Sequence, residues 1–213
     1  MRIESIAAQP DRAGRHLVKF SDGTSMRLYP QTVEDMGLYA GLELEEATYT
    51  QLKQEAGKMS ARMRAVRIVA ASNVSRRDLQ NRLIRKGEDP DQAGEAVQWM
   101  EDLALVDDRR TAKQIVDRCA AKGYGRSRAK QALYEKQIPC EYWDEALVDY
   151  PDMTDKIYGY LCSKLPKEWD ERDLKRAIDA LMRRGHGYGQ IRSALERLEI
   201  EADDLQEDTQ WQI

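Results

Sequence analysis

The side chains of this 213-residue chain that are most suited to binding a ligand are the cations of a run from Asp107 to Ile138. The run holds nine lysines and arginines against four acidic residues, which makes it the most basic part of the sequence. Several cations on one surface favour phosphate binding, because each neutralised phosphate releases condensed counterions. Tyr124 and Tyr134 lie among these cations and could stack on unpaired bases. The plainer interpretation is that the cations only solvate the outer side of a helical stack.

Catalysis and metal binding have few candidate residues. The two histidines, His16 and His186, are far apart in the sequence. The three cysteines, Cys119, Cys140 and Cys162, have no CxxC spacing, and we expect them to be reduced thiols in the core. These positions provide no ligand spacing typical of a metal site. The sequence therefore predicts a protein that is not an enzyme and that has no cofactor or metal.

Two other motifs have structural explanations. The glycine-rich segment 185–189 precedes no Lys-Ser or Lys-Thr pair, and it follows a predicted helix rather than a strand. We expect it to cap that helix and form a turn, and the Gly123-Tyr124-Gly125 segment has the same interpretation. The acidic pair Asp107-Asp108 is explained by capping of the next helix. The pair Asp203-Asp204 is explained by solvation of the tail.

The basic run itself is predicted to form two short helices joined by the glycine turn. An apolar stripe on the first helix recurs at i, i+3, i+4 and i+7, which is typical of a buried face, and it consists of Ala112, Ile115, Val116 and Cys119. On the second helix Ala129, Ala132 and Leu133 are expected to turn inward. An outer stripe at i, i+4 and i+8 carries Arg126, Lys130 and Tyr134.

The chain also aligns with itself at offsets of about 50 and about 48 residues. The matching inward positions of the closing helices are Ala93, Trp143 and Ile191; Ala96, Ala146 and Ala194; Val97, Leu147 and Leu195; and Met100, Tyr150 and Leu198. An alanine repeated between bulkier residues predicts a close helix crossing. The predicted fold class is therefore mainly α, with tandem three-helix repeats in an elongated, curved arrangement and a small N-terminal β-rich extension.

The predicted domains follow from this repeat. They are residues 1–58 for a β-hairpin or meander extension with a linking helix, 59–105, 106–150 and 151–199 for the three repeats, and 200–213 for an acidic C-terminal tail. Gly57 is expected to break or bend the first long helix. Arg64 and Arg67 are expected to face solvent.

Short runs with partial alternation predict three strands in the extension. Their approximate bounds are Arg2 to Ala8, Arg15 to Phe20 and Ser25 to Tyr29, with a hairpin turn at Ser21-Asp22-Gly23-Thr24.

The formal net charge of −4 conceals a polarity along the chain. Residues 60–140 have a net charge of +6, whereas residues 141–213 have a net charge of −8. The N-terminus lacks the apolar core of a signal peptide, and nowhere do about 18 apolar residues run together. We therefore expect a cytoplasmic protein without a membrane partner.

The segment around the basic run resembles the central signature of the RecX family, small bacterial proteins that regulate the RecA recombinase. The matching residues are Leu105-Val106-Asp107-Asp108, Arg110, Ala112, Lys122-Gly123, Arg126, Leu133 and Lys136. The sequence departs from the family pattern at two places. Thr111 stands where the family usually has an aromatic residue, and Gln137 stands where it usually has a glycine before the isoleucine.

The resemblance implies a monomeric protein that binds the RecA nucleoprotein filament on single-stranded DNA. Members of this family modulate that filament, commonly by inhibiting strand exchange and ATP hydrolysis, in DNA repair and the SOS response. The residues we expect to contact the filament or the DNA are Arg118, Lys122, Arg126, Arg128, Lys130 and Lys136. Two alternatives stay open at this point: a nonspecific nucleic-acid-binding module without a recombinase partner, and a helical scaffold for another protein.

Overall fold

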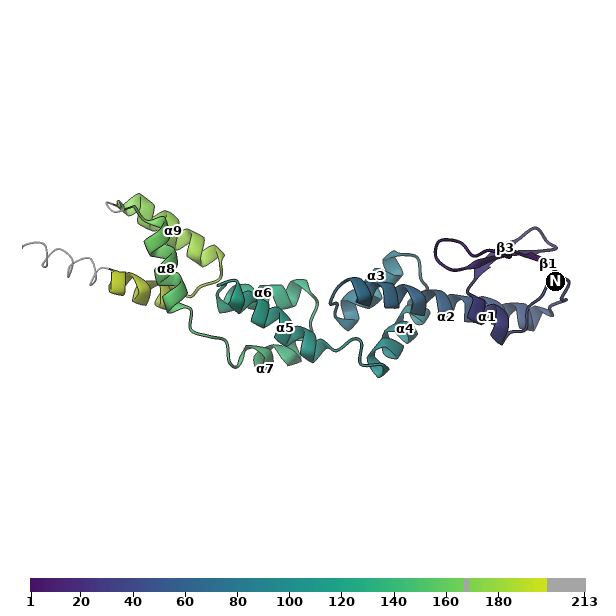
Figure 1. Cartoon of the computed structure of the whole chain (residues 1–213). Coiled ribbons are helices and arrows are strands. Elements are labelled where there is room, and N and C mark those ends of the chain that lie inside the picture. The colour runs from purple at the N-terminus through teal and green to yellow at the C-terminus, as the bar shows by residue number, and fades with distance from the viewer. Residues whose placement is uncertain (167–168, 199–213) are drawn as a thin grey trace, which may run out of the picture. The chain divides into compact units, whose positions relative to one another are not determined.

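A computed structural model describes residues 1–166 and 169–198 (Figure 1). The chain divides between Asp107 and Asp108 into two units. The first unit contains a small sheet and four helices among the described elements, and the second contains helices only. The mainly α fold with an N-terminal β-rich extension is therefore confirmed. The elongated, curved stacking of repeats and the five domain boundaries stay predictions.

The sheet of the first unit is an antiparallel meander in the order β1-β2-β3. Its strands are β1 (Ile3–Ile6), β2 (His16–Phe20) and β3 (Ser25–Leu28). Val18 pairs with Met26, and the register between β1 and β2 shifts between Ile3 and Ser5. The predicted turn joins β2 and β3, with Gly23 at φ 81°, a conformation that glycine adopts without steric cost.

A single long helix, α2 (Glu46–Ala71), supports both halves of the first unit. Its first half packs through Leu52 on the buried face of the sheet, together with Phe20 and Leu28. α1 (Pro30–Asp35) connects β3 to the loop before α2. α2 runs through Gly57 without a break, so the predicted break was wrong. A methyl group at Gly57 would overlap the Gln92 side chain of α4.

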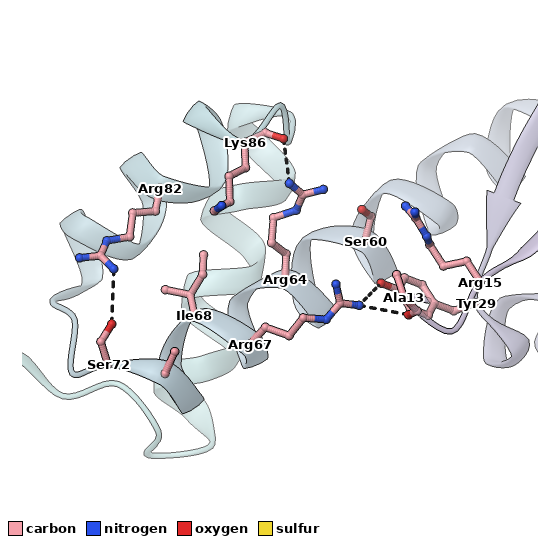
Figure 2. Close-up of a pocket in the computed structure, with 11 residues that line it drawn as sticks. Ala13, Arg15, Tyr29, Ser60, Arg64, Arg67, Ile68, Ser72, Arg82 and Lys86 are labelled. Atoms are coloured by element: carbon pink, nitrogen blue, oxygen red, sulfur yellow. Dashed lines mark hydrogen bonds between the residues drawn. The ribbon is translucent and has the colours of Figure 1, made fainter. Parts of the chain in front are cut away.

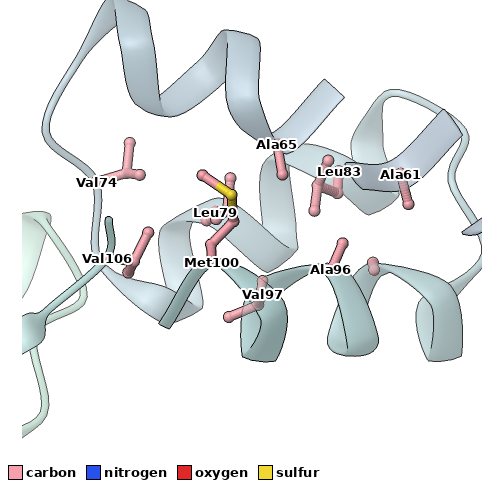
Figure 3. Close-up of a cluster of buried hydrophobic side chains, with 10 residues drawn as sticks. Ala61, Ala65, Val74, Leu79, Leu83, Ala96, Val97, Met100 and Val106 are labelled. Carbon is pink, nitrogen blue, oxygen red and sulfur yellow. The ribbon is translucent and has the colours of Figure 1, made fainter. Parts of the chain in front are cut away.

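The second half of α2 forms a three-helix set with α3 (Arg76–Arg85) and α4 (Pro90–Asp102). Ser75 caps α3 by accepting from the Asp78 N–H, and Asp89 caps α4 by accepting from the N–H groups of Asp91 and Gln92. Small residues line the packed faces of α2 and α4. Figure 3 shows the resulting cluster, in which Ala61, Ala65, Leu79, Leu83, Ala96, Val97 and Met100 point into a common space.

The second unit contains two hydrophobic clusters. One gathers residues of α5 (Asp108–Ala121), α6 (Arg126–Glu135), the 3-10 turn η1 (Cys140–Tyr142) and α7 (Trp143–Leu147). The other gathers residues of α8 (Thr154–Lys164), α9 (Glu171–Arg183) and the helix over residues 188–198. Tyr150 packs against both clusters.

α7 is much shorter than its predicted counterparts. It ends at Leu147, whereas the repeat alignment predicts helical positions from Trp143 to Tyr150. Pro151 follows Tyr150, and a residue before proline is disfavoured in the helical conformation. Tyr150 nevertheless reaches the core, because its hydroxyl donates to the Tyr124 carbonyl at 2.7 Å.

One further expectation was wrong, and another falls outside the residues that the structure describes. Of the three cysteines only Cys119 is buried, since Cys140 and Cys162 are exposed free thiols. The acidic tail predicted for residues 200–213 lies outside the described residues.

Candidate partner and nucleic-acid interface

The predicted basic face lies on α5 and α6, and the apolar stripes of these helices position it. α5 buries Ala112, Val116 and Cys119, and α6 buries Ala129 and Leu133. These side chains form one cluster with Leu147 of α7. Because the apolar residues face this cluster, the cations between them face outward, as the helical periodicity predicts.

The six predicted contact residues are all at least partly accessible. Arg118, Lys122, Arg126, Lys130 and Lys136 are exposed, and Arg128 is half-buried. Arg118 lies in the last turn of α5 and Lys122 directly after it. Arg126 begins α6, Lys130 lies one turn further on, and Lys136 is the C-cap residue.

The structure brings three of these cations together around Cys119. Burial raises the pKa of the Cys119 thiol, and the charges of Arg128, Lys122 and Arg118 partly oppose that rise. Cations from the end of α5 and from α6 therefore lie near the same buried thiol. A thiol with a raised pKa is a poor nucleophile, which agrees with a packing role for Cys119.

Arg128 differs from the other five because it has an internal partner. Its Nη1 atom donates to a carboxylate oxygen of Glu135 at 2.9 Å. This hydrogen bond raises the pKa of Arg128, and the hydrogen bonds from Arg128 and Gln131 lower the pKa of Glu135. Among the described residues, Arg118, Lys122, Arg126 and Lys130 have no carboxylate partner. These four cations are therefore better placed for a partner than Arg128.

The two tyrosines of the basic run have different surroundings. Tyr134 is 69 % exposed on the outer face of α6. Tyr124 packs against the α5–α6 cluster, and the guanidinium of Arg184 lies over its ring at 5.5 Å. Tyr134, on the stripe with Arg126 and Lys130, is thus the better candidate for stacking on a base.

The glycine turns have the predicted capping role, and they also contact each other. Gly123 and Gly185 have φ values of 68° and 84°, at the ends of α5 and α9. The Gly125 N–H donates to the Arg184 carbonyl at 2.9 Å, and the Ser127 N–H donates to the Gly185 carbonyl at 3.2 Å. A methyl group at Gly125 would overlap the Gly185 backbone.

This contact adds two cations that sequence reasoning missed. Lys156 and Arg184 line a pocket of about 320 Å³ together with Lys122 and His186. The Lys156 ammonium donates to the Ala120 carbonyl at 2.8 Å. Both residues belong to the acidic segment 141–213, so the segmental charge count concealed them. The repeated glycine turn is the signal that could have revealed the contact.

Other types of site have little support in the described part of the chain. No three His, Cys, Asp or Glu side chains there are grouped so that they could hold a metal ion. None of the described helices has the length and apolar character needed to cross a membrane.

Comparison with known proteins identifies the same helices. A family model described as RecX, second three-helix domain, matches residues 107–147, which include α5, α6 and α7. The regulatory protein RecX of Chlorobaculum tepidum is 29 % identical over 144 residues, covering 66 % of this chain and 89 % of that protein. The regulatory protein RecX of Streptococcus gordonii is 21 % identical over 192 residues, covering 88 % of this chain and 74 % of that protein.

Solved structures show a similar fold. A crystal structure of regulatory protein RecX has a TM-score of 0.67 and 15 % identity, and the match covers 92 % of this chain and 98 % of that one. The crystal structure of RecX from Lactobacillus salivarius has a TM-score of 0.60 and 19 % identity, and the match covers 68 % of this chain and 97 % of that one.

Proposed function

Because this chain belongs to the RecX family, we propose that it regulates the RecA recombinase by binding, as a monomer, to the RecA filament on single-stranded DNA. The observation that carries this proposal is the match of α5–α7 to the family, together with four cations in or directly after α5 and α6 that have no carboxylate partner among the described residues: Arg118, Lys122, Arg126 and Lys130. The regulation is non-covalent. Such regulation requires only that the protein bind one conformational state of the filament more tightly than another, because a ligand shifts a conformational equilibrium by its difference in affinity for the two states.

The direction we propose is inhibition of strand exchange and of ATP hydrolysis, in DNA repair and the SOS response. A protein that binds along a filament and bridges its subunits opposes the rearrangements that accompany ATP turnover. The exposed cations are suited to an acidic protein surface or to phosphates, and such charges chiefly determine the association rate and the specificity.

A double variant of the basic face tests this proposal. Arg126→Ala/Lys130→Ala removes two exposed cations of α6 that have no carboxylate partner within the described residues. We expect the concentration that half-inhibits RecA ATPase on single-stranded DNA to rise roughly 5- to 30-fold, because two exposed ion pairs are worth about 1–2 kcal/mol together.

The matched control is Arg77→Ala/Lys19→Ala, which removes an exposed arginine and an exposed lysine from the first unit. It should inhibit like the wild type. If both double variants inhibit equally well, or if the wild-type protein leaves the ATPase rate unchanged, the proposal is wrong.

The second candidate function is a nonspecific nucleic-acid-binding module, and the exposed Tyr134 among cations favours it. Titration against bare single strands and against preformed RecA filaments separates the two functions. Equal affinities with a steep salt dependence would favour the nonspecific module. Tighter binding to the filament would favour the regulator.

A further inference from the structure

A second group of cations lies in the first unit, around a pocket of about 430 Å³ (Figure 2). The pocket lies between the segment before β2, helix α2 and helix α3. Its lining has no acidic residue and five cations: Arg15, Arg64, Arg67, Arg82 and Lys86. Such a lining favours an anionic ligand.

Three separate segments supply these cations. Arg15 directly precedes β2, Arg64 and Arg67 lie one turn apart on α2, and Arg82 and Lys86 come from α3 and its C-cap. No short motif of the sequence contains all five. The packing of the sheet and of α3 against α2 brings them to one place.

The charges in the pocket are only partly compensated. Arg15 pairs with Asp11 and Arg82 with Asp78, both at 2.8 Å. Arg64 pairs with the buried Glu88 at 2.6 Å. Among the described residues Arg67 and Lys86 have no carboxylate partner. Five cations therefore face three carboxylates, and a positive charge remains.

Hydrogen bonds to neutral groups hold three of the guanidinium groups in place (Figure 2). Arg82 Nη1 donates to the Ser72 hydroxyl at 3.4 Å. Arg67 Nη2 donates to the Tyr29 hydroxyl at 2.7 Å and to the Ala13 carbonyl at 3.2 Å. Arg64 Nη1 donates to the Lys86 carbonyl at 2.9 Å. Arg64 and Arg67 have further N–H groups, and their positions are set before a ligand arrives, which lowers the entropic cost of binding.

We propose that this pocket binds a phosphate group. Guanidinium forks and an ammonium group are the donors that phosphate oxygens favour. The volume exceeds that of one phosphate, and Ile68 and Ala71 provide an apolar wall beside the cations, where an attached sugar fits. A phosphate of a nucleic-acid strand and a free phosphate share this chemistry.

The pocket shares no lining residue with the basic face of α5 and α6 or with the residues that match the family model. The proposal therefore does not rest on RecA regulation. It is tested with the purified full-length chain in the absence of RecA.

The ligands for the test are inorganic phosphate and a short single-stranded thymidine oligonucleotide, titrated by calorimetry in chloride buffer. Lys86→Gln removes an ammonium group that makes no hydrogen bond or ion pair with the described residues, and Arg67→Gln removes the second uncompensated cation. We expect each variant to bind about tenfold more weakly, the loss typical of a hydrogen bond to a charged group. For the oligonucleotide, Lys86→Gln should also lower the slope of log affinity against log salt by about one.

Lys19→Gln is the matched control, because it removes one charge from an exposed lysine of β2 outside the pocket. It should bind like the wild type. Binding of inorganic phosphate alone would identify a free anion as the ligand, whereas binding of the oligonucleotide would identify a nucleic-acid backbone. The proposal is overturned if the wild-type chain binds neither ligand, or if Lys86→Gln binds as tightly as the wild type.

Discussion

Arg67 and Arg128 both lie on helices in basic surroundings, but their hydrogen-bond partners differ. Arg128 donates to the carboxylate of Glu135, whereas Arg67 donates to a hydroxyl and a carbonyl group. A carboxylate partner compensates the charge of a guanidinium, and a neutral partner orients it without compensation. Both residues are arginines in the sequence. Only their neighbours in space show that the charge of Arg128 is compensated and that the charge of Arg67 is available to an anion.

Arg64 shows the same dependence on neighbours. The helical pattern predicts that it faces solvent, whereas the structure places it against the buried Glu88 and the Lys86 carbonyl. Glu88 also accepts from the Ser60 hydroxyl at 3.0 Å. The prediction holds for Arg67, which is exposed, and only in part for Arg64, which is half-buried because Glu88 and the Lys86 carbonyl lie against it.

His186 provides a prediction at the same scale. The residue is 4 % exposed, and its buried Nδ1 atom has no hydrogen-bond partner in the part of the chain that the structure describes. Burial lowers the pKa of His186 below its ordinary value of 6.5, the positive charge of Arg184 lowers it further, and a hydrogen bond with the Gly123 backbone opposes the shift. Lys122 and Lys156 line the same pocket and add positive charge.

The unfolded chain takes up a proton on His186 as the pH falls through about 6.5, whereas the native protein takes it up only at lower pH. The free energy of unfolding of the second unit should therefore fall between pH 8 and pH 5.5. Urea unfolding at both pH values measures this change. The wild-type protein should lose more stability than His186→Gln over this range.

The control compares the free energies of unfolding of the wild type and of His186→Gln at pH 8. At that pH the side chain at position 186 is neutral in both proteins, so only its packing differs. The carboxylates with lowered pKa, such as Asp11 and Asp152, stay ionised at pH 5.5. An equal loss of stability in the wild type and in His186→Gln would contradict the prediction.

At the scale of elements, several helices of this chain end in the same way. A residue with positive φ follows the C-cap, and its N–H and the next N–H donate back to the last turn. The positions with positive φ after α3, α4, α5, α6 and α9 are Gly87, Ala104, Gly123, Gln137 and Gly185. Three of these are glycine, which adopts this conformation freely. Gln137 occupies the position where the RecX pattern usually has glycine.

Ala104 gives a clear test of the strain at such a position. Its φ is 54°, its N–H donates to the Glu101 carbonyl at 2.7 Å, and the Leu105 N–H donates to the Met100 carbonyl at 3.0 Å. Ala104→Gly removes the steric cost of the methyl group and keeps both bonds. We expect the free energy of unfolding to rise by about 0.5–1 kcal/mol in urea denaturation.

Ala70→Gly is the matched control, at an exposed position in the last turn of α2. The same substitution should lower the free energy of unfolding there by up to about 1 kcal/mol, because glycine is a poor helix former. If Ala104→Gly destabilises the protein as much as Ala70→Gly does, position 104 carries no such strain.

At the scale of the whole molecule, the cores of the two units contain no common residue. The buried clusters of the first unit end at Val106, and those of the second begin at Ala112. Leu83→Ala removes a fully buried side chain of the first unit, and it should destabilise that unit by about 2–5 kcal/mol. Hydrogen exchange followed by mass spectrometry should then show faster exchange in residues 1–107 and unchanged exchange in residues 108–198.

Leu181→Ala is the reciprocal variant, at a buried position of α9. It should accelerate exchange in residues 108–198 and leave residues 1–107 unchanged. Faster exchange in both units from either substitution would show that they unfold as one cooperative body.

Much of the architecture follows from local sequence. The three strands, the continuous helical pattern and the inward stripe of α5 depend on residues close together in the chain, and the structure confirms them. The third helix of the second set was predicted too long, because an alignment of repeats transfers length from one copy to another. Pro151 acts on this copy alone.

Cys140 and Cys162 were assigned to the core because they lie beside apolar patterns. Both are exposed, because such a pattern does not define which way a residue near the end of an element faces.

The sequence by itself determined the helical class, the N-terminal meander, the basic run and the resemblance to the RecX family, because periodicity, turn residues and motif spacing are properties of neighbouring residues. Only the tertiary structure decided which cations have a carboxylate partner that compensates their charge. It paired Arg128 and Arg64 with carboxylates, joined Lys156 and Arg184 of an acidic segment to the basic one, and gathered five cations from three segments into one pocket. The physical reason is that electrostatic interactions depend on distance in space, and packing between distant segments determines that distance.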